Sequence, residues 1–225
     1  MKIYFDLDDT LYDQIIPFQK ASDEVFGEFE HIDMRSFYKE FKKYSDEIFA
    51  DGQTGKIPLI ETHVYRITNA CKSYSIEITR EQAIHFQEVY LSKQAEISLS
   101  QPMKQLLTEL TKKNIELGII TNGPSDHQRM KISKLGLERW IDNNHIYISQ
   151  EVGILKPNPA IFERIGSTAD YLYIGDSYEN DVESSKAAGW SCVWLNKKQG
   201  IATNVLPDYE VYNENELIQL VLSLL

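Results

Sequence analysis

Five short apolar runs recur along this chain, with stretches of helical periodicity between most of them. The runs are KIYF at 2–5, IELGII at 115–120, HIYI at 145–148, YLYIG at 171–175 and SCVWL at 191–195. Short apolar runs that are bounded by turn residues and alternate with amphipathic segments are typical of βα units. We therefore predict an α/β fold with a parallel-sheet core whose strands are spread over the whole chain.

One long segment interrupts this alternation. Residues 14–95 contain no comparable strand run. Their helical patterns cover 15–30, 34–50, 60–74 and 79–94. The sequence therefore predicts a helical domain over 14–95, inserted directly after the first strand, and a sheet domain formed by residues 1–13 and 96–225.

The net charge of the chain limits the kinds of partner that it is expected to bind. The 225 residues carry a formal net charge of -11, and no basic cluster offsets it. Nucleic-acid polymers and anionic membranes are bound through Lys and Arg patches, so neither is expected as a partner. The apolar tail LIQLVLSLL is much shorter than a membrane span, and Cys71 and Cys192 lie outside metal-binding spacings. We expect a cytoplasmic protein without a disulfide, and the sequence gives no indication of an oligomeric partner.

Polar side chains follow four of the predicted strands. The first strand is followed by Asp6, Asp8 and Thr10, the second by Thr121, Asn122 and Gly123, the third by a loop carrying Lys156, and the fourth by Asp176, Ser177, Asn180 and Asp181. In an open α/β sheet, ligands bind outside the carboxyl ends of the strands, where these loops converge. We therefore expect these side chains to form one site.

The residue types in this site indicate phosphoryl chemistry. Carboxylates from two strand ends repel one another unless a hard divalent cation lies between them, and ligation by oxygen alone favours Mg²⁺. Lys156 supplies a positive charge, and Thr121 with the amides of residues 121–123 supplies donors that suit a dianionic phosphoryl group. A carboxylate can also act as a nucleophile that forms an aspartyl-phosphate, and Asp6 is the first candidate.

The sequence resembles a known family at these residues. DLDDT at 6–10, TNG at 121–123, Lys156 within EVGILKPNPAIF, and GDSYEND at 175–181 are similar, in order and spacing, to the four motifs of the haloacid dehalogenase (HAD) superfamily. The resemblance implies a Rossmann-like core, and the helical insertion is similar to the C1-type cap of that family. A first motif of the form DxDxT resembles the phosphatase and phosphomutase branches.

The resemblance also implies roles for single residues. Asp6 would attack phosphorus, Asp8 would protonate the leaving group and later activate water, and Thr121 and Lys156 would bind the phosphoryl group. Mg²⁺ would be held by Asp6, the main-chain carbonyl of Asp8, and Asp176, while Asp181 would either ligate the ion or orient its surroundings. The amides of Asn122 and Gly123 would assist in binding phosphate. Because the cap roofs the leaving group in this family, we expect Phe18 to contribute to substrate binding.

Taken together, these observations predict a Mg²⁺-dependent phosphatase that hydrolyses a small phosphorylated metabolite through an aspartyl-phosphate on Asp6. The helix after TNG, with Gln128 and Lys131, resembles the branch that contains nucleoside 5'-monophosphatases and acylneuraminate 9-phosphatases, so a nucleoside 5'-monophosphate or a sugar phosphate is the expected substrate. A phosphomutase of the same family is one alternative. A phospho-accepting, receiver-like signalling protein is another, since receiver domains also combine paired acids, Mg²⁺, Thr and Lys.

Overall fold

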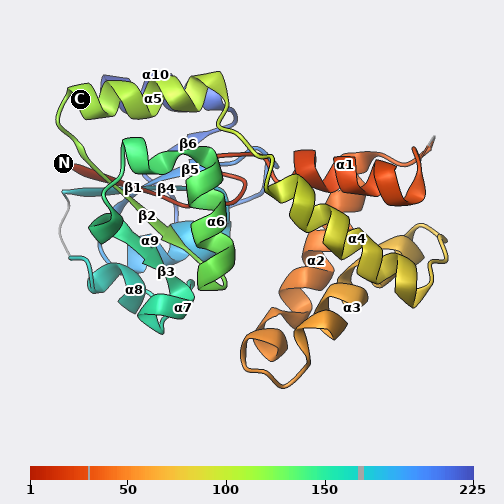
Figure 1. Cartoon of the computed structure of the whole chain (residues 1–225). Coiled ribbons are helices and arrows are strands. Elements are labelled where there is room, and N and C mark those ends of the chain that lie inside the picture. Colours follow the sequence, from red (N-terminus) through yellow and green to blue (C-terminus); the bar gives the residue numbers. More distant parts are fainter. Residues whose placement is uncertain (30, 167–169) are drawn as a thin grey trace. The chain divides into compact units, whose positions relative to one another are not determined.

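The computed structural model describes residues 1–29, 31–166 and 170–225. The chain forms two compact units. Residues 1–13 and 98–225 make one, called the core unit here, and residues 14–97 make the other, the helical unit. Figure 1 shows the sheet in the first and the long helices α1–α4 in the second. No helix within the described ranges is long and apolar enough to cross a membrane.

The core unit contains a six-stranded sheet with the order β3-β2-β1-β4-β5-β6. Every pair of neighbouring strands is parallel. The strands are β1 Lys2–Phe5, β2 Glu116–Thr121, β3 Ile146–Ile148, β4 Tyr171–Gly175, β5 Ser191–Leu195 and β6 Tyr209–Val211. The predicted α/β fold with a Rossmann-like parallel sheet is confirmed. The sixth strand was not predicted, because it has only three residues and Tyr209 and Glu210 are exposed.

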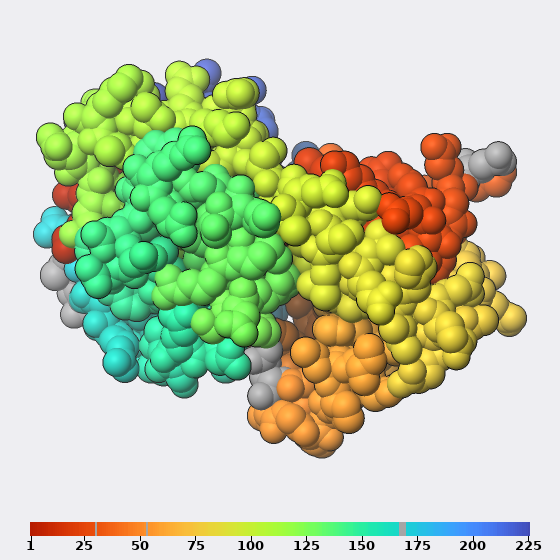
Figure 2. Space-filling view, in the orientation of Figure 1, coloured from red at the N-terminus to blue at the C-terminus, as the bar shows by residue number. Residues whose placement is uncertain are grey.

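Helices cover the sheet on both faces. They are α5 Gln101–Lys112, α6 Ser125–Leu135, α7 Ser149–Val152, α8 Ala160–Glu163, α9 Ser184–Ala187 and α10 Glu214–Ser223. Helices α5 and α10 pack against each other on one side of the sheet (Figure 1). In Figure 2, the side chains of α5 and α6, yellow-green to green, form a large part of the visible surface of the core unit.

An aromatic cluster fixes the central strands of the sheet. Tyr4 of β1 packs against Tyr171 of β4 and Trp190, with ring centroids 6.0 and 5.4 Å apart. Gly118 of β2 lies beside Tyr4, and a Cβ atom at this position would come within 2.1 Å of the tyrosine ring. The ring therefore requires glycine in the neighbouring strand.

The strand register brings three loops together at the carboxyl edge of the sheet. Phe5, the last residue of β1, is paired with Ile119 of β2 and with Ile174 of β4. The amide of Asp6 then donates a hydrogen bond to the carbonyl of Ile174, 2.9 Å away. Because β1 lies between β2 and β4, the residues that follow all three strands emerge side by side.

The helical unit consists of four helices with clear boundary signals. They are α1 Ile15–Phe26, α2 Met34–Gln53, α3 Leu59–Ser73 and α4 Arg80–Gln94. Asp33 caps α2 through its side chain, and Thr79 with Gln82 forms a capping box at α4. Helix α1 ends at Phe26, before Gly27, so it is shorter than the predicted segment 15–30, of which residue 30 lies outside the described residues.

Phe18 lies at the centre of the helical unit. Its side chain has 0% exposure, and its ring packs against the rings of Phe41 and Phe86 with centroids 4.8 and 5.6 Å apart. Phe37, Tyr38 and Tyr90 surround it as well. A ring enclosed in this way has no surface to offer a ligand. The prediction that Phe18 binds substrate is therefore wrong, and its role is to pack the helices.

We expect Phe18→Ala to destabilise the helical unit by about 3–5 kcal/mol, because it opens a cavity among these rings. All three tryptophans of the chain lie in the core unit, so tryptophan fluorescence follows that unit, while far-ultraviolet circular dichroism follows both. Urea unfolding of the variant should show part of the helical signal lost before the fluorescence changes. Ile16→Ala, on the same helix but 55% exposed, is the matched control. Equal stability of the two variants would contradict the assignment of Phe18 to the core.

Candidate active site

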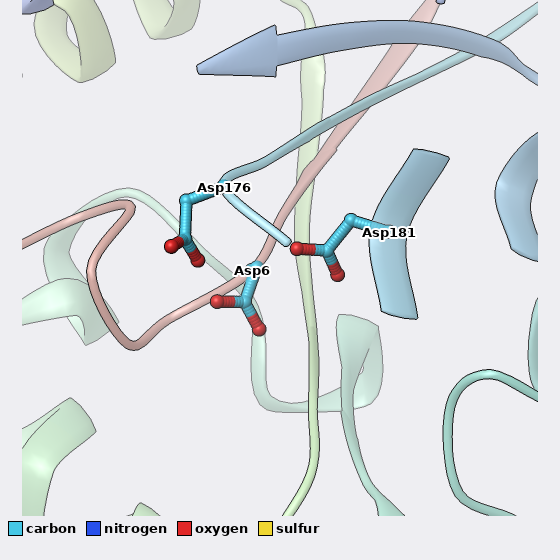
Figure 3. Close-up of side chains that lie close together, drawn as sticks. All are labelled: Asp6, Asp176 and Asp181. Atoms are coloured by element: carbon cyan, nitrogen blue, oxygen red, sulfur yellow. The ribbon is translucent and has the colours of Figure 1, made fainter. Parts of the chain in front are cut away.

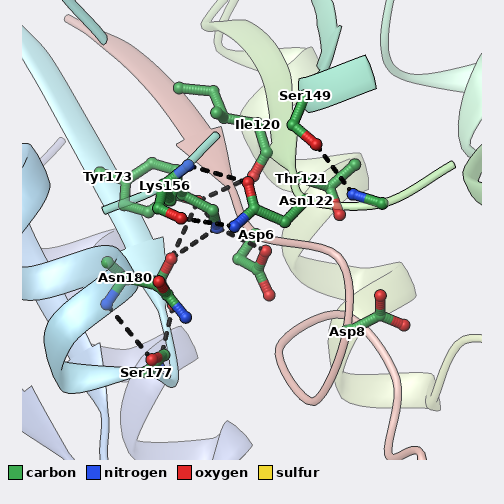
Figure 4. A network of polar contacts seen from close by, with 12 residues as sticks. Asp6, Asp8, Ile120, Thr121, Asn122, Ser149, Lys156, Tyr173, Ser177 and Asn180 are labelled. Atoms are coloured by element: carbon green, nitrogen blue, oxygen red, sulfur yellow. Dashed lines mark hydrogen bonds and ion pairs between the residues drawn. The ribbon is translucent and has the colours of Figure 1, made fainter. Parts of the chain in front are cut away.

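A buried lysine joins the loops that follow three strands. Lys156 is 2% exposed, and its Nζ lies 2.7 Å from Oδ1 of Asp6 and 2.6 Å from Oδ1 of Asp181. It also donates to the hydroxyl of Tyr173, 2.8 Å away (Figure 4). The three protons of the ammonium group are thus matched by three acceptors. Burial alone would lower the pKa of Lys156, but the charges of Asp181 and Asp6 outweigh it and raise that pKa above its ordinary value.

Tyr173 supports this lysine and was not recognised in the sequence. Its hydroxyl accepts from Lys156 and donates to the carbonyl of Ile120 in β2, at 2.9 Å. The residue belongs to β4, where it reads as one more buried aromatic in an apolar run. No local signal in the sequence marks its hydroxyl as part of the site.

Asn122 and Ser149 hold the loops around Lys156. The Asn122 amide group donates to the Lys156 carbonyl at 2.7 Å, and its oxygen accepts from the Lys156 amide at 2.9 Å. The amide of Gly123 donates to Oγ of Ser149 at 3.0 Å. The prediction that the Gly123 amide is open to a phosphoryl oxygen is therefore wrong for this structure, because Ser149 already satisfies it. The Asn122 side chain likewise positions the lysine loop.

Three carboxylates gather beside Lys156. Asp6, Asp176 and Asp181 each offer an oxygen within 4.8 Å of the others, and Figure 3 shows their side chains pointing toward one another. Burial raises the pKa of Asp6 well above its ordinary value; Lys156 opposes this, while Asp181, Asp176 and Asp8 add to it. Burial also raises the pKa of Asp176 to about 6, against the opposing charge of Lys198. The donors are all carboxylate oxygens, which fits Mg²⁺ and does not fit zinc.

The three carboxylates differ in how many of their oxygens already accept a hydrogen bond or an ion pair. Oδ1 of Asp181 accepts from Lys156, and its Oδ2 accepts from the Ser177 amide at 2.9 Å. Oδ2 of Asp176 pairs with Nζ of Lys198 at 2.9 Å, and the Lys198 side chain is 61% exposed. Within the described part of the chain, Oδ2 of Asp6 accepts no hydrogen bond. Asp6 and Asp176 therefore have oxygens that a cation or substrate can reach, whereas Asp181 is held by its neighbours.

Asp8 lies apart from this cluster (Figure 4). Its carboxylate accepts from Tyr12 and Lys131, each through Oδ1, at 2.6 and 2.7 Å, and from Gln128 through Oδ2 at 2.9 Å. Burial would raise the pKa of Asp8, but the Lys131 charge and these hydrogen bonds outweigh burial and hold the pKa well below its ordinary value. Thr121, 1% exposed at the end of β2, contacts the same Gln128 amide at 2.6 Å.

The parallel sheet and the buried carboxylates around Lys156 at its carboxyl edge define an α/β protein. Residues 3–195 match the haloacid dehalogenase-like hydrolase family. The chain therefore belongs to this family, and the resemblance seen in its sequence motifs is confirmed.

Relatives of nearly equal length carry phosphatase names. The chain is 28% identical to the pyrimidine 5'-nucleotidase YjjG of Escherichia coli, over 97% of this chain and 96% of that protein. It is also 28% identical to the N-acylneuraminate-9-phosphatase of Rattus norvegicus, over 99% and 94% of the two chains. These relatives place the chain among the phosphoric monoester hydrolases of the family.

A solved structure supports the fold. The Bacillus subtilis protein YfnB, determined with bound magnesium, superposes with a TM-score of 0.72 at 22% identity and covers 98% of this chain and 97% of its own. At this identity the likeness concerns the fold alone.

The raised pKa of Asp176 predicts a pH effect on the metal-free protein. The native pKa of Asp176 is about 6 and its ordinary value is 3.8, so the folded protein binds this proton more tightly than the unfolded chain. The stability that the bound proton contributes is complete below about pH 4 and is lost as the pH rises through about 6. Asp176→Asn should lack this loss, which amounts to about 2–3 kcal/mol between these pH values. Urea unfolding in EDTA, followed by tryptophan fluorescence, measures it.

The comparison with wild type is needed because His63 acts in the opposite sense: burial lowers its pKa to about 4, so its contribution grows as the pH rises. That contribution is common to both proteins. Parallel pH profiles for wild type and Asp176→Asn would contradict the effect assigned to Asp176.

Proposed function

We propose that this chain is a Mg²⁺-dependent phosphatase that hydrolyses a small phosphomonoester through an aspartyl-phosphate on Asp6. The observation that carries the proposal is the contact of Lys156 with both Asp6 and Asp181. A carboxylate can approach a phosphate dianion only where positive charge offsets the repulsion. The lysine supplies such charge beside a carboxylate oxygen that remains open.

In the first half of the reaction, Oδ2 of Asp6 attacks phosphorus in line with the leaving oxygen. A bond forms between phosphorus and Asp6, the bond between phosphorus and the ester oxygen breaks, and Asp8, whose pKa the negative charge of the bound phosphate raises, gives a proton to that oxygen. Thr121 and Lys156 bind the non-bridging oxygens. In the second half, Asp8 takes a proton from water as the water attacks phosphorus, and inorganic phosphate leaves Asp6.

A metal ion would be held by Asp6, Asp176 and the main-chain carbonyl of Asp8. The chemistry that Mg²⁺ would supply there is neutralisation of the negative charge on the carboxylates and the phosphoryl group. Asp181 has both oxygens engaged, by Lys156 and by the Ser177 amide, so we assign it the orientation of Lys156 in preference to direct ligation.

The substrate class rests on the relatives. One is a nucleotidase and another a sugar-acid phosphatase, and both align over nearly the whole chain. We therefore propose a nucleoside 5'-monophosphate or a sugar phosphate as substrate. The helical unit over 14–97 would serve as the cap that contacts the leaving group.

A phosphate-release screen with Mg²⁺ over nucleoside 5'-monophosphates and sugar phosphates tests this function. We expect turnover without any added bisphosphate, which a phosphomutase would require. Asp6→Asn should abolish turnover, because an amide is a poor nucleophile. The variant also loses the ion pair between Lys156 and Asp6 and should be less stable, so far-ultraviolet circular dichroism under assay conditions checks that it is folded. EDTA should abolish turnover as well. Wild-type activity of Asp6→Asn, or full activity without metal, would contradict the proposal.

Asp8→Asn should discriminate between leaving groups. An alkoxide leaves poorly without a proton, whereas nitrophenolate needs little help, and general acid catalysis contributes roughly 10²- to 10⁴-fold. In rapid-mix kinetics, the variant should form the phosphoenzyme far more slowly from an alkyl phosphate than from p-nitrophenyl phosphate. Equal slowing on both substrates would remove Asp8 from the acid role.

A further inference from the structure

The carboxylate of Asp8 is held by a pair of residues one turn apart on α6. Lys131 donates to Oδ1 at 2.7 Å and to Oδ2 at 3.0 Å, and Gln128 donates to Oδ2 at 2.9 Å. Positions three apart lie on the same face of a helix, so both side chains reach Asp8 together. Tyr12 adds a local contact from the Asp8 loop itself, at 2.6 Å.

Lys131 is an unusual residue for this position. It is 3% exposed, and the two oxygens of Asp8 are its hydrogen-bond partners among the described residues. A buried ammonium group is costly unless it is paired, and most helix positions with this burial are apolar. Packing alone would be served better by an aliphatic side chain. The charge is therefore explained by Asp8.

Gln128 links Asp8 to the end of β2. Its Nε2 lies 2.6 Å from Oγ1 of Thr121 and 3.0 Å from the carbonyl of Asn122, in addition to Asp8. Its Oε1 is buried without a hydrogen-bond partner. Reversing the amide would turn that oxygen toward the Asp8 carboxylate and the Asn122 carbonyl, which would repel it. The orientation is thus set by the acceptors, at the cost of one unpaired oxygen.

Gly123 makes room for this amide. Its φ is +144°, and a Cβ atom there would lie 3.2 Å from Cδ and Cγ of Gln128. The turn that ends β2 and the side chain that spans to Asp8 therefore fit together only with glycine at this position.

We propose that Gln128 and Lys131 are positioning residues that hold the Asp8 carboxylate in a fixed place relative to Thr121. The inference rests on the proposed function, in which Asp8 transfers protons and Thr121 binds the phosphoryl group. Strand β2 ends at Thr121, and the helix that follows it, α6, carries the two groups that set the position of the acid. Neither residue needs to touch the substrate, so both act on kcat through Asp8.

The test is a double-mutant cycle between Lys131→Met and Asp8→Asn, with turnover of an alkyl phosphate as the readout. Lys131→Met should lower kcat about 10- to 100-fold, the range typical of a misplaced catalytic group, and leave KM within about threefold. In the Asp8→Asn background the same change should cost less than about twofold, because the group it positions is already inactive. Lys131→Arg, which keeps the charge, should recover part of the rate.

Lys134→Met is the matched control, since it makes the same substitution on an exposed residue of the same helix. Thermal unfolding of every variant checks the fold. If Lys131→Met does not fold, Gln128→Met, which removes the donor with little change in size, replaces it in the cycle. Because Gln128 also contacts Thr121, only the part of its effect on kcat that vanishes in the Asp8→Asn background then supports the inference.

The outcomes separate the two hypotheses. If Asp8→Asn is impaired but Lys131→Met either has no effect or multiplies fully with it, the positioning role is overturned while the proposed function stands. If Asp8→Asn itself turns over the alkyl phosphate at the wild-type rate, Asp8 has no proton-transfer role and the positioning inference is overturned, whereas the proposed function is overturned by wild-type activity of Asp6→Asn. A strong effect of Lys131→Met that vanishes in the Asp8→Asn background supports the inference.

Discussion

The ion pairs of Lys156 are the interaction on which the site depends. One buried ammonium group meets Asp6 after β1, Asp181 after β4 and Tyr173 within β4. Removing one partner of such a pair leaves an uncompensated buried charge, which costs about 3–5 kcal/mol of stability. The position of Lys156 is also fixed relative to β2, because the Asn122 side chain, which follows β2, makes two hydrogen bonds with the Lys156 backbone. Three strand ends are thereby tied to one point.

The site divides its acids into two electrostatic environments. Asp6 and Asp176 lie in a crowded, buried group of carboxylates in which burial raises their pKa values. Asp8 lies against Lys131, whose charge outweighs burial and lowers the Asp8 pKa. Environments that push the pKa values of neighbouring acids apart are typical of sites that assign them different tasks. Here the first group is suited to a divalent cation, and Asp8 is held ionised and fixed in place by Lys131 in the free protein.

The sequence predicted the parts of this protein that are local or strongly patterned. The runs at 171–175 and 191–195 match β4 and β5 residue for residue, because short apolar runs between turn residues leave little choice of structure. The acids Asp6, Asp176 and Asp181 were brought together correctly because parallel strands end at one edge. Side-chain direction was beyond such reasoning. Nothing in the spacing around Phe18 distinguishes a core ring from a ligand contact, and the use of the Gly123 amide by Ser149 depends on the start of helix α7, 26 residues away.

The insertion of the helical unit between β1 and β2 also bears on how the chain folds. These two strands pair directly, yet residues 14–97 separate them, so their contact closes a very long loop. The entropy of closing a flexible loop grows with the logarithm of its length, by about 0.6 kcal/mol for each doubling. The helical unit is continuous in sequence, and its first helix, α1, packs against its last, α4. If it folds early, the ends of the insertion are brought together and the loop that remains flexible is shorter. Once the insertion is folded, the ends of β1 and β2 are closer in space than their separation in the sequence suggests. Pairing of β1 with β2 then costs less entropy than closing a flexible loop of the same length.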